Sequence, residues 1–194
     1  MAVLAGGESS RMGELKSELR INGQPILEFL LHRWKWTDPT LLVTAPGRQH
    51  PTGWQSFDRE VVDEIPRQGP LRGIVTALEN SLHAQAVIVA TCDMPLITRA
   101  MLEHLVEALM TNENASAVMS KHDGQIEPFP IIMRTAMLDP LHERLRSADR
   151  SIHSLVGIEN VLIIDAPPTW DERVWTNLNS PHDYERFLAD HEPQ

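Results

Sequence analysis

The stretch AVLAGGESSRMGELK, residues 2–16, begins with four apolar residues that run directly into two glycines. A polar segment with one arginine and one lysine follows. The apolar run predicts a buried strand, and the glycines allow a tight turn whose backbone N–H groups approach a ligand closely. Arg11 and Lys16 add two cations suited to phosphate oxygens, although such charges are often simply solvated. We expect an anion-binding loop at the carboxyl end of the first strand.

Strand-like and helical patterns alternate along the rest of the chain. Short apolar runs predict strands at 2–5, 40–45, 60–62, 86–91, 115–119, 129–133 and 161–165. Apolar residues at helical spacing predict helices at 25–36, 72–83, 97–110 and 180–190, the last with Ser180 as N-cap and Pro181 after it. This alternation indicates a single Rossmann-like α/β domain, residues 1–194, with a mostly parallel twisted sheet and helices on both faces. In such a domain ligands bind beyond the carboxyl ends of the strands.

The composition narrows the choice of partners. The 194 residues carry a net charge of −10, which argues against nucleic acid or an anionic membrane surface. No apolar run approaches the length of a membrane span, and no secretory leader is recognisable. The single cysteine, Cys92, fits a reducing compartment, so we expect a cytoplasmic protein. The nine histidines show no metal-ligand spacing, so a zinc site is not expected.

The spacing within the opening loop excludes two common phosphate-binding motifs. A P-loop requires GxxxxGK[ST], but two residues separate Gly13 from Lys16, and the Gly6–Gly7 pair does not provide GxGxxG. The loop instead resembles the signature LAGGxSxRMGxxK of the MobA-like NTP transferases, above all the molybdenum cofactor guanylyltransferases among them. The matching residues are Leu4, Ala5, Gly6, Gly7, Ser9, Arg11, Met12, Gly13 and Lys16. One departure is Leu15, where many members of the family have an acidic residue.

The resemblance implies that this loop wraps a nucleoside triphosphate. The nucleotide-binding residues would then be Leu4, Ala5, Gly6, Gly7 and Lys16. Arg11 and Lys16 would meet the phosphates and act as catalytic cations. Relatives that transfer a cytidylyl group tend to have Ala-Gly at the position of the glycine pair, so the sequence here favours GTP.

A second segment, VVDEIPRQGPLRGIVTALE (residues 61–79), combines a strand end with a helix start. In the family, a GPLxG motif at this place holds the base and ribose, which assigns Gly69, Pro70 and Gly73 to nucleotide binding. Asp63 falls on the position of an acidic residue associated with guanine. A carboxylate accepts hydrogen bonds from the N1–H and 2-amino group of guanine, a pattern that adenine does not offer. Alternatively, Asp63 only caps a turn and GPLRG only starts a helix.

A third segment, AVIVATCDMPLI (residues 86–97), delivers a carboxylate to the carboxyl edge of the sheet. A carboxylate at that position, facing a triphosphate, is a minimal ligand for Mg²⁺. The resemblance agrees, because CDxP is the metal-binding segment of the family, and it makes Asp93 a metal-binding, nucleotide-binding and catalytic residue. The alternative role of helix N-cap is one that Thr98 can fill. Cys92 is expected to pack in the core and not to act as a nucleophile.

A fourth segment, WTNLNSPHDYERF (residues 175–187), resembles the C-terminal part of the family. It places Asn177 and Asn179 near the acceptor substrate and the reacting phosphates, unless Asn179 serves only as a helix cap. Arg72, Lys121 and Arg134 are expected to be surface charges, unless an acceptor phosphate reaches one of them.

Taken together, the resemblance implies transfer of GMP from GTP to the phosphate of molybdopterin, with Mg²⁺ as cofactor and release of pyrophosphate. Apo-molybdoenzymes or other maturation proteins would be downstream partners. Two alternatives remain open at this level. One is a related transferase that uses CTP or another phosphorylated acceptor, such as a sugar phosphate. The other is a non-catalytic nucleotide-binding regulator, which the joint presence of Arg11, Lys16 and Asp93 disfavours.

Overall fold

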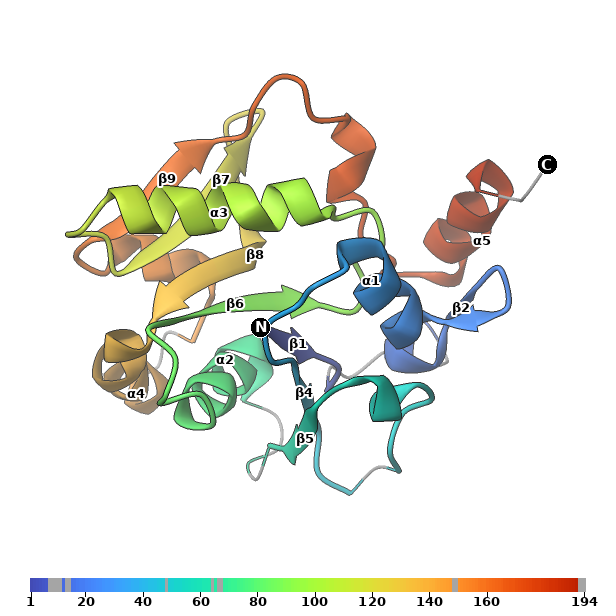
Figure 1. The fold of residues 1–194 in the computed structure, drawn as a ribbon, viewed down its shortest axis with the longest axis horizontal. Coiled ribbons are helices and arrows are strands. Elements are labelled where there is room, and N and C mark those ends of the chain that lie inside the picture. The colour runs from blue at the N-terminus through green and yellow to red at the C-terminus, as the bar shows by residue number, and fades with distance from the viewer. Residues whose placement is uncertain are drawn as a thin grey trace.

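The computed structural model of the chain describes residues 1–6, 12, 15–47, 49–63, 65, 68–147 and 150–191. A seven-stranded sheet with the order β5-β4-β1-β6-β8-β7-β9 forms its centre (Figure 1). The strands are β1 (Ala2–Leu4), β4 (Leu41–Thr44), β5 (Arg59–Val62), β6 (Ala86–Thr91), β7 (Ala117–His122), β8 (Gln125–Arg134) and β9 (Val161–Asp165). Each overlaps one of the predicted apolar runs, and the central strands β4 and β6 are the most fully buried, as expected of strands covered on both faces.

The sheet is mostly parallel, as predicted. β1 pairs in parallel with β4 and β6, β4 with β5, and β7 with β9. β8 runs antiparallel to both β6 and β7. Because Val89 pairs with Ile131, the middle of β8 approaches the carboxyl end of β6.

Helices cover both faces of the sheet, as predicted. They are α1 (Ile26–Trp34), α2 (Gly69–Glu79), α3 (Arg99–Thr111), α4 (Leu138–Arg146) and α5 (Pro181–Asp190). α2 packs against β1, β4, β6 and α4. α1 contacts the segment just before α3, because the buried indole N–H of Trp34 donates to the carbonyl of Ile97. In Figure 1, α2 and α4 lie on one side of β6, and α1 and α3 lie on the other.

One α-helix and one hairpin were not predicted. The helix is α4, in which Pro140 lies in the first turn, where its missing N–H costs nothing. Its buried Leu141 and Leu145 are four residues apart and form a narrow apolar stripe. The second element is a hairpin of β2 (Arg20–Ile21) and β3 (Gln24–Pro25), joined by Asn22 and Gly23 with positive φ. Asn-Gly is the preferred dipeptide for such a two-residue turn.

The C-terminal helix begins as the sequence predicts. The Ser180 hydroxyl accepts a hydrogen bond from the backbone N–H of Asp183, and the Asp183 carboxylate in turn accepts from the backbone N–H of Ser180. This capping box, followed by Pro181, fixes the start of α5. The segment before α5 is thereby held where it passes the carboxyl edge of the sheet. Among the helices of the described ranges, none is both long enough and apolar enough to cross a membrane.

Candidate active site

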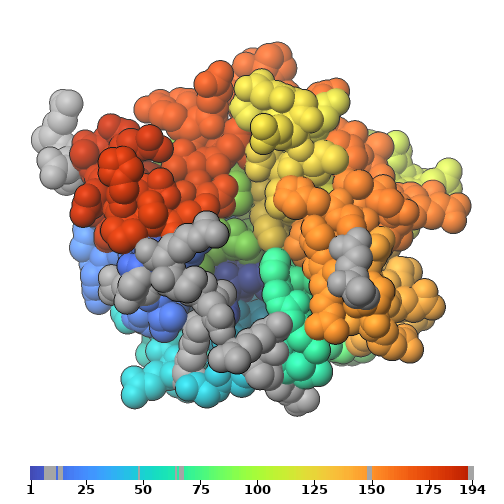
Figure 2. Space-filling model, turned by 180° about the vertical axis from the view of Figure 1, so that it is seen from behind, coloured from blue at the N-terminus to red at the C-terminus, as the bar shows by residue number. Residues whose placement is uncertain are grey.

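A cavity of about 650 Å³ lies at the carboxyl edge of the sheet. Its walls come from the ends of β1, β4, β5 and β6, from the start of α2, and from Phe129 and Asn177. Figure 2 shows this region as a hollow bordered by α2, by the β7–β8 part of the chain and by the C-terminal segment. The hollow is where a doubly wound sheet places its ligand.

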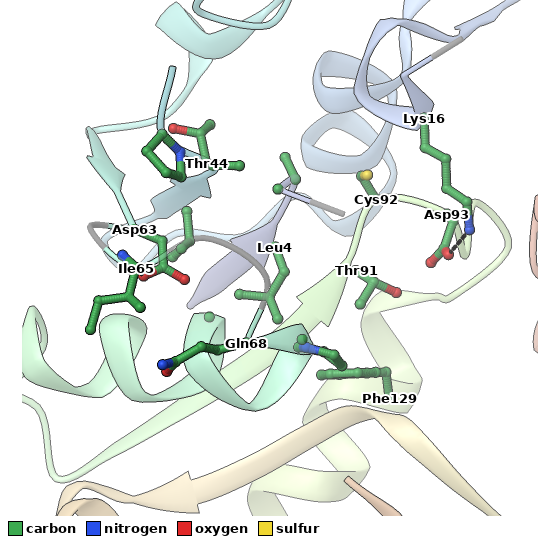
Figure 3. A pocket seen from close by; sticks show the side chains of 18 of the residues that line it. Leu4, Lys16, Thr44, Asp63, Ile65, Gln68, Thr91, Cys92, Asp93 and Phe129 are labelled. Carbon is green, nitrogen blue, oxygen red and sulfur yellow. Dashed lines mark hydrogen bonds and ion pairs between the residues drawn. The ribbon is translucent and has the colours of Figure 1, made fainter. Parts of the chain in front are cut away.

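The cavity has two carboxylates at opposite ends. Asp63 follows β5, and its backbone N–H donates to the Thr44 carbonyl, which continues the β4–β5 ladder. Asp93 follows β6 one residue beyond Cys92, whose N–H donates to the carbonyl of Leu4. Figure 3 shows Asp63 and Asp93 on either side of the cavity, with Leu4 between them. One ligand can therefore contact both ends.

Lys16 is the cation at the Asp93 end of the cavity. Its ammonium group lies 2.5 Å from Asp93 Oδ2 and 2.6 Å from Asn179 Oδ1, and it donates to both. The side chains of Lys16 and Asp93 are 21% and 17% exposed, so the pair is partly shielded from solvent. Three segments far apart in the sequence thus converge on one charged cluster.

The second carboxylate oxygen of Asp93, Oδ1, indicates what this end of the cavity can bind. Oδ1 is buried, and no described residue hydrogen-bonds to it. An unsatisfied buried carboxylate oxygen is costly, and a hard divalent cation is a ligand that would satisfy it. Asp93 therefore fits the metal-binding role that the sequence assigns to it. Within the described ranges no three His, Cys, Asp or Glu side chains gather into a metal cluster, so phosphate and water would have to supply the other ligands.

The C-terminal segment is tied to Asp93 through its backbone. The N–H of Leu178 donates to the Asp93 carbonyl at 2.8 Å, and the Leu178 side chain is fully buried. Its neighbours Asn177 and Asn179 are consequently held at the site: Asn177 lines the cavity, and Asn179 binds Lys16. Ser180 caps α5, so Asn179 keeps its side chain for Lys16.

Two glycines of the predicted motifs are required by close approach. A Cβ at Gly6 would lie 3.0 Å from the backbone nitrogen of Ala45. A side chain at this position would therefore force apart the two segments that follow β1 and β4. A Cβ at Gly73 would lie 3.2 Å from the side chain of Leu4. Gly73 therefore allows α2 to approach the end of β1 and leaves the Leu4 side chain in place as a cavity wall.

The remaining predicted nucleotide-binding residues are also placed together. Leu4, Ala5, Gly6, Gly69, Pro70 and Gly73 all line the cavity. Gly7 and Arg11 lie outside the described residues, as do Ser9 and Gly13 of the same loop. Phe129, Thr44, Gln68 and Thr91 line the cavity but were not singled out from the sequence. Phe129 lies there because β8 runs antiparallel to β6, a direction that the apolar run 129–133 does not reveal.

Asp63 has a more complex environment than the sequence suggested. Its Oδ1 accepts hydrogen bonds from the backbone N–H of Ile65 and from Arg72 Nε, both at 3.2 Å. The turn-capping role and the cavity-lining position are therefore both present in one side chain. Arg72 is a buried partner of carboxylates and not the surface charge that was expected, since its side chain is only 12% exposed. The Arg134 guanidinium group also has protein partners, because it donates hydrogen bonds to the carbonyls of Ala115 and Leu109.

Cys92 is buried beside the charged cluster, as predicted. Burial is the main cause that raises the pKa of its thiol to about 12, and the adjacent Asp93 carboxylate adds to the effect. The thiolate fraction near pH 8 is then about 10⁻⁴, and the thiolate is the reactive form. We expect the folded protein to resist alkylation by iodoacetamide, while the unfolded chain takes up one label, which a mass measurement reads directly. Rapid labelling of the native protein at neutral pH would contradict the buried placement.

These features, two carboxylates at the carboxyl edge of a mostly parallel sheet with a glycine-lined cavity between them, define a nucleotidyltransferase domain. The family model of the MobA-like NTP transferase domain matches residues 1–161, and the chain belongs to that family.

Similar proteins agree with this assignment. The chain is 31% identical to a molybdenum cofactor guanylyltransferase of Vibrio cholerae, with 97% of this chain and 91% of that protein covered. It is 30% identical to a probable molybdenum cofactor guanylyltransferase of Carboxydothermus hydrogenoformans, with 97% and 94% covered. The crystal structure of molybdopterin-guanine dinucleotide biosynthesis protein A from Archaeoglobus fulgidus superposes with a TM-score of 0.80 at 26% identity, with 97% and 96% covered.

Proposed function

We propose that this protein transfers GMP from GTP to the terminal phosphate of molybdopterin, forming a guanine dinucleotide cofactor and releasing pyrophosphate. The observation that carries the proposal is the cluster of Lys16, Asp93 and Asn179 at one end of a cavity whose other end holds Asp63. In this cluster Asp93 Oδ1 is buried and has no hydrogen-bond partner among the described residues. The names of the relatives support the same acceptor and the same nucleotide.

The reaction is a displacement at the α-phosphorus. An oxygen of the acceptor phosphate forms a bond to that phosphorus while the bond to the bridging oxygen of the β-phosphate breaks. The electron pair leaves with pyrophosphate. The acceptor is a phosphate monoester that is already ionised at neutral pH, so no general base is needed. Catalysis then depends on alignment and on stabilisation of charge in the transition state.

Lys16 and Asp93 would each contribute to the stabilisation of charge. The Asp93 carboxylate would hold Mg²⁺ through Oδ1, and the ion would supply positive charge to the phosphate oxygens. Lys16 already lies beside this carboxylate, and its ammonium group neutralises negative charge as it develops on the departing pyrophosphate. The fixed Leu178–Asp93 backbone contact keeps the carboxylate in position during the reaction.

The base would lie at the opposite end, against Leu4 and Gly73, with Asp63 at its edge. Because Arg72 and Ile65 already occupy Asp63 Oδ1, the donors of guanine would meet Oδ2. Adenine has an acceptor at N1 and would face this carboxylate unfavourably. Asn177 and Asn179, beside Lys16, would contact the acceptor or the reacting phosphates without adding charge.

Titration calorimetry with GTP, CTP, ATP and UTP, each with Mg²⁺, tests the nucleotide assignment. We expect tightest binding of GTP. Preferential binding of CTP would assign this protein to the relatives that transfer a cytidylyl group. It would also contradict the proposed recognition of guanine by Asp63. Equal binding of all four nucleotides would contradict base recognition at this end of the cavity.

A further inference from the structure

Arg72 is a largely buried charged side chain near the base end of the cavity, and the sequence had left its role open. It lies in the first turns of α2, and its guanidinium group joins two carboxylates. Nε donates to Asp63 Oδ1 at 3.2 Å, and an Nη2 hydrogen donates to Glu79 Oε2 at 2.8 Å. Arg72 and Asp63 are only 12% and 15% exposed, so their contact is largely shielded from water and from salt.

Glu79 gives Arg72 a second anchor. It lies seven residues further along α2, on the same face of the helix. Its other oxygen lies 3.3 Å from His142 Nε2 on α4, the helix that packs against α2. The planar guanidinium is therefore held between a carboxylate before α2 and one at its end. Such a fork geometry fixes orientation in a way that a single point charge cannot.

The contact with Arg72 helps to fix the orientation of the Asp63 carboxylate. The Asp63 side chain could otherwise turn about its χ2 torsion, which is broad for a terminal carboxyl group. Two donors on Oδ1, from Arg72 and from the backbone of Ile65, select one orientation. No described residue provides a hydrogen bond to Oδ2, and Asp63 lines the cavity. The pair of contacts thus leaves one oxygen for a ligand.

We propose that Arg72 is a positioning residue for base selection: it holds the Asp63 carboxylate so that one oxygen meets a purine base carrying hydrogen-bond donors at N1 and at the 2-amino group. The proposal deepens the proposed function and rests on it, because it concerns the same nucleotide cavity. In this account Arg72 acts on the two carboxylates that its Nε and Nη2 groups bind, and it has no part in binding the nucleotide phosphates.

The test compares Arg72→Gln and Arg72→Lys with wild type in titrations with GTP, inosine triphosphate and ATP. Inosine triphosphate retains N1–H but lacks the 2-amino group. Arg72→Lys keeps a positive charge between the two carboxylates, which protects the fold, but loses the fork. Arg59→Gln is the matched control, because Arg59 is an exposed arginine at the opposite end of β5, bound to Asn80.

In both Arg72 variants the Kd for GTP should rise about 10-fold, the scale expected when one charge-assisted hydrogen bond is misaligned. The Kd for ATP should stay unchanged, so the preference for GTP over ATP narrows. The turnover number at saturating GTP should remain near the wild-type value, while KM rises. Arg59→Gln should leave all these quantities unchanged.

A double variant separates positioning from a purely structural role. Once Asp63→Asn has removed the carboxylate, adding Arg72→Lys should weaken GTP binding no further. Additive losses in the double variant, or equal losses for GTP and ATP, would overturn the proposal and assign Arg72 to the fold or to the phosphates. If wild type itself shows no preference for GTP over ATP, the proposed function fails. If wild type prefers GTP and Arg72→Lys keeps that preference, the inference about Arg72 fails alone.

Discussion

Asp93→Asn should lower the turnover number by about 10²–10³-fold, the usual loss when a group that stabilises transition-state charge is removed. The substitution preserves the shape of the side chain but removes the negative charge that, in the proposed mechanism, would bind a divalent cation. The backbone contact from Leu178 to residue 93 does not depend on the side chain, so the fold should persist. Pyrophosphate release at saturating GTP, together with the thermal unfolding midpoint, measures both effects.

The matched control for this variant is Asp165→Asn. Asp165 is an exposed aspartate at the end of β9, where it pairs with Lys121 at the surface. It should retain wild-type turnover. Raising the Mg²⁺ concentration should partly restore Asp93→Asn, because an amide oxygen still binds the cation weakly. If Asp93→Asn retained a turnover number within a few-fold of wild type, the assignment of Asp93 as the metal ligand would be wrong.

Lys16→Ala should cost a similar factor, about 10²–10³ in kcat/KM for GTP. The loss would have a different origin, because the substitution removes the cation that, in the proposed reaction, neutralises the departing pyrophosphate. Both kcat and the affinity for GTP should fall, since the proposal has the ammonium group contact the phosphates before and during the reaction. Steady-state kinetics over a range of GTP concentrations separates the two contributions.

Lys35→Ala serves as its control, because Lys35 lies exposed just after α1. The pair Lys16–Asp93 is partly shielded, so removing Lys16 also leaves the Asp93 carboxylate with one partner fewer. If Lys16→Ala changed only the melting temperature and left kcat/KM intact, the lysine would be a structural partner of Asp93 and nothing more.

The sheet was predictable because its central strands are buried. Continuous apolar runs mark such strands, and all seven predicted runs overlap a strand. The direction of β8 was not predictable, because an apolar run has no polarity in sequence. α4 was not predicted, because it is only nine residues long and buries only Leu141 and Leu145, which gives little helical periodicity in the sequence.

The candidate site divides in the same way. Asp63 and Asp93 could be placed from the sequence, because each follows a strand and parallel strands end at one edge. The contact between Lys16 and Asn179 joins residues 163 positions apart, and only the folded chain brings them together. Arg72 looked like a helix surface charge, since its partners lie nine residues before it and seven after it. Neither spacing is one of the i,i+3 and i,i+4 spacings by which ion pairs on a helix are recognised in sequence.

The most direct measurement of the central claim is product formation. Purified protein is incubated with GTP, Mg²⁺ and molybdopterin, and the products are identified by mass spectrometry alongside a pyrophosphate assay. The account predicts a guanine dinucleotide of molybdopterin and one pyrophosphate for each molecule formed, with both lost in Asp93→Asn. A protein that binds GTP and molybdopterin but forms no dinucleotide, or that forms the cytosine dinucleotide from CTP in preference, would contradict it.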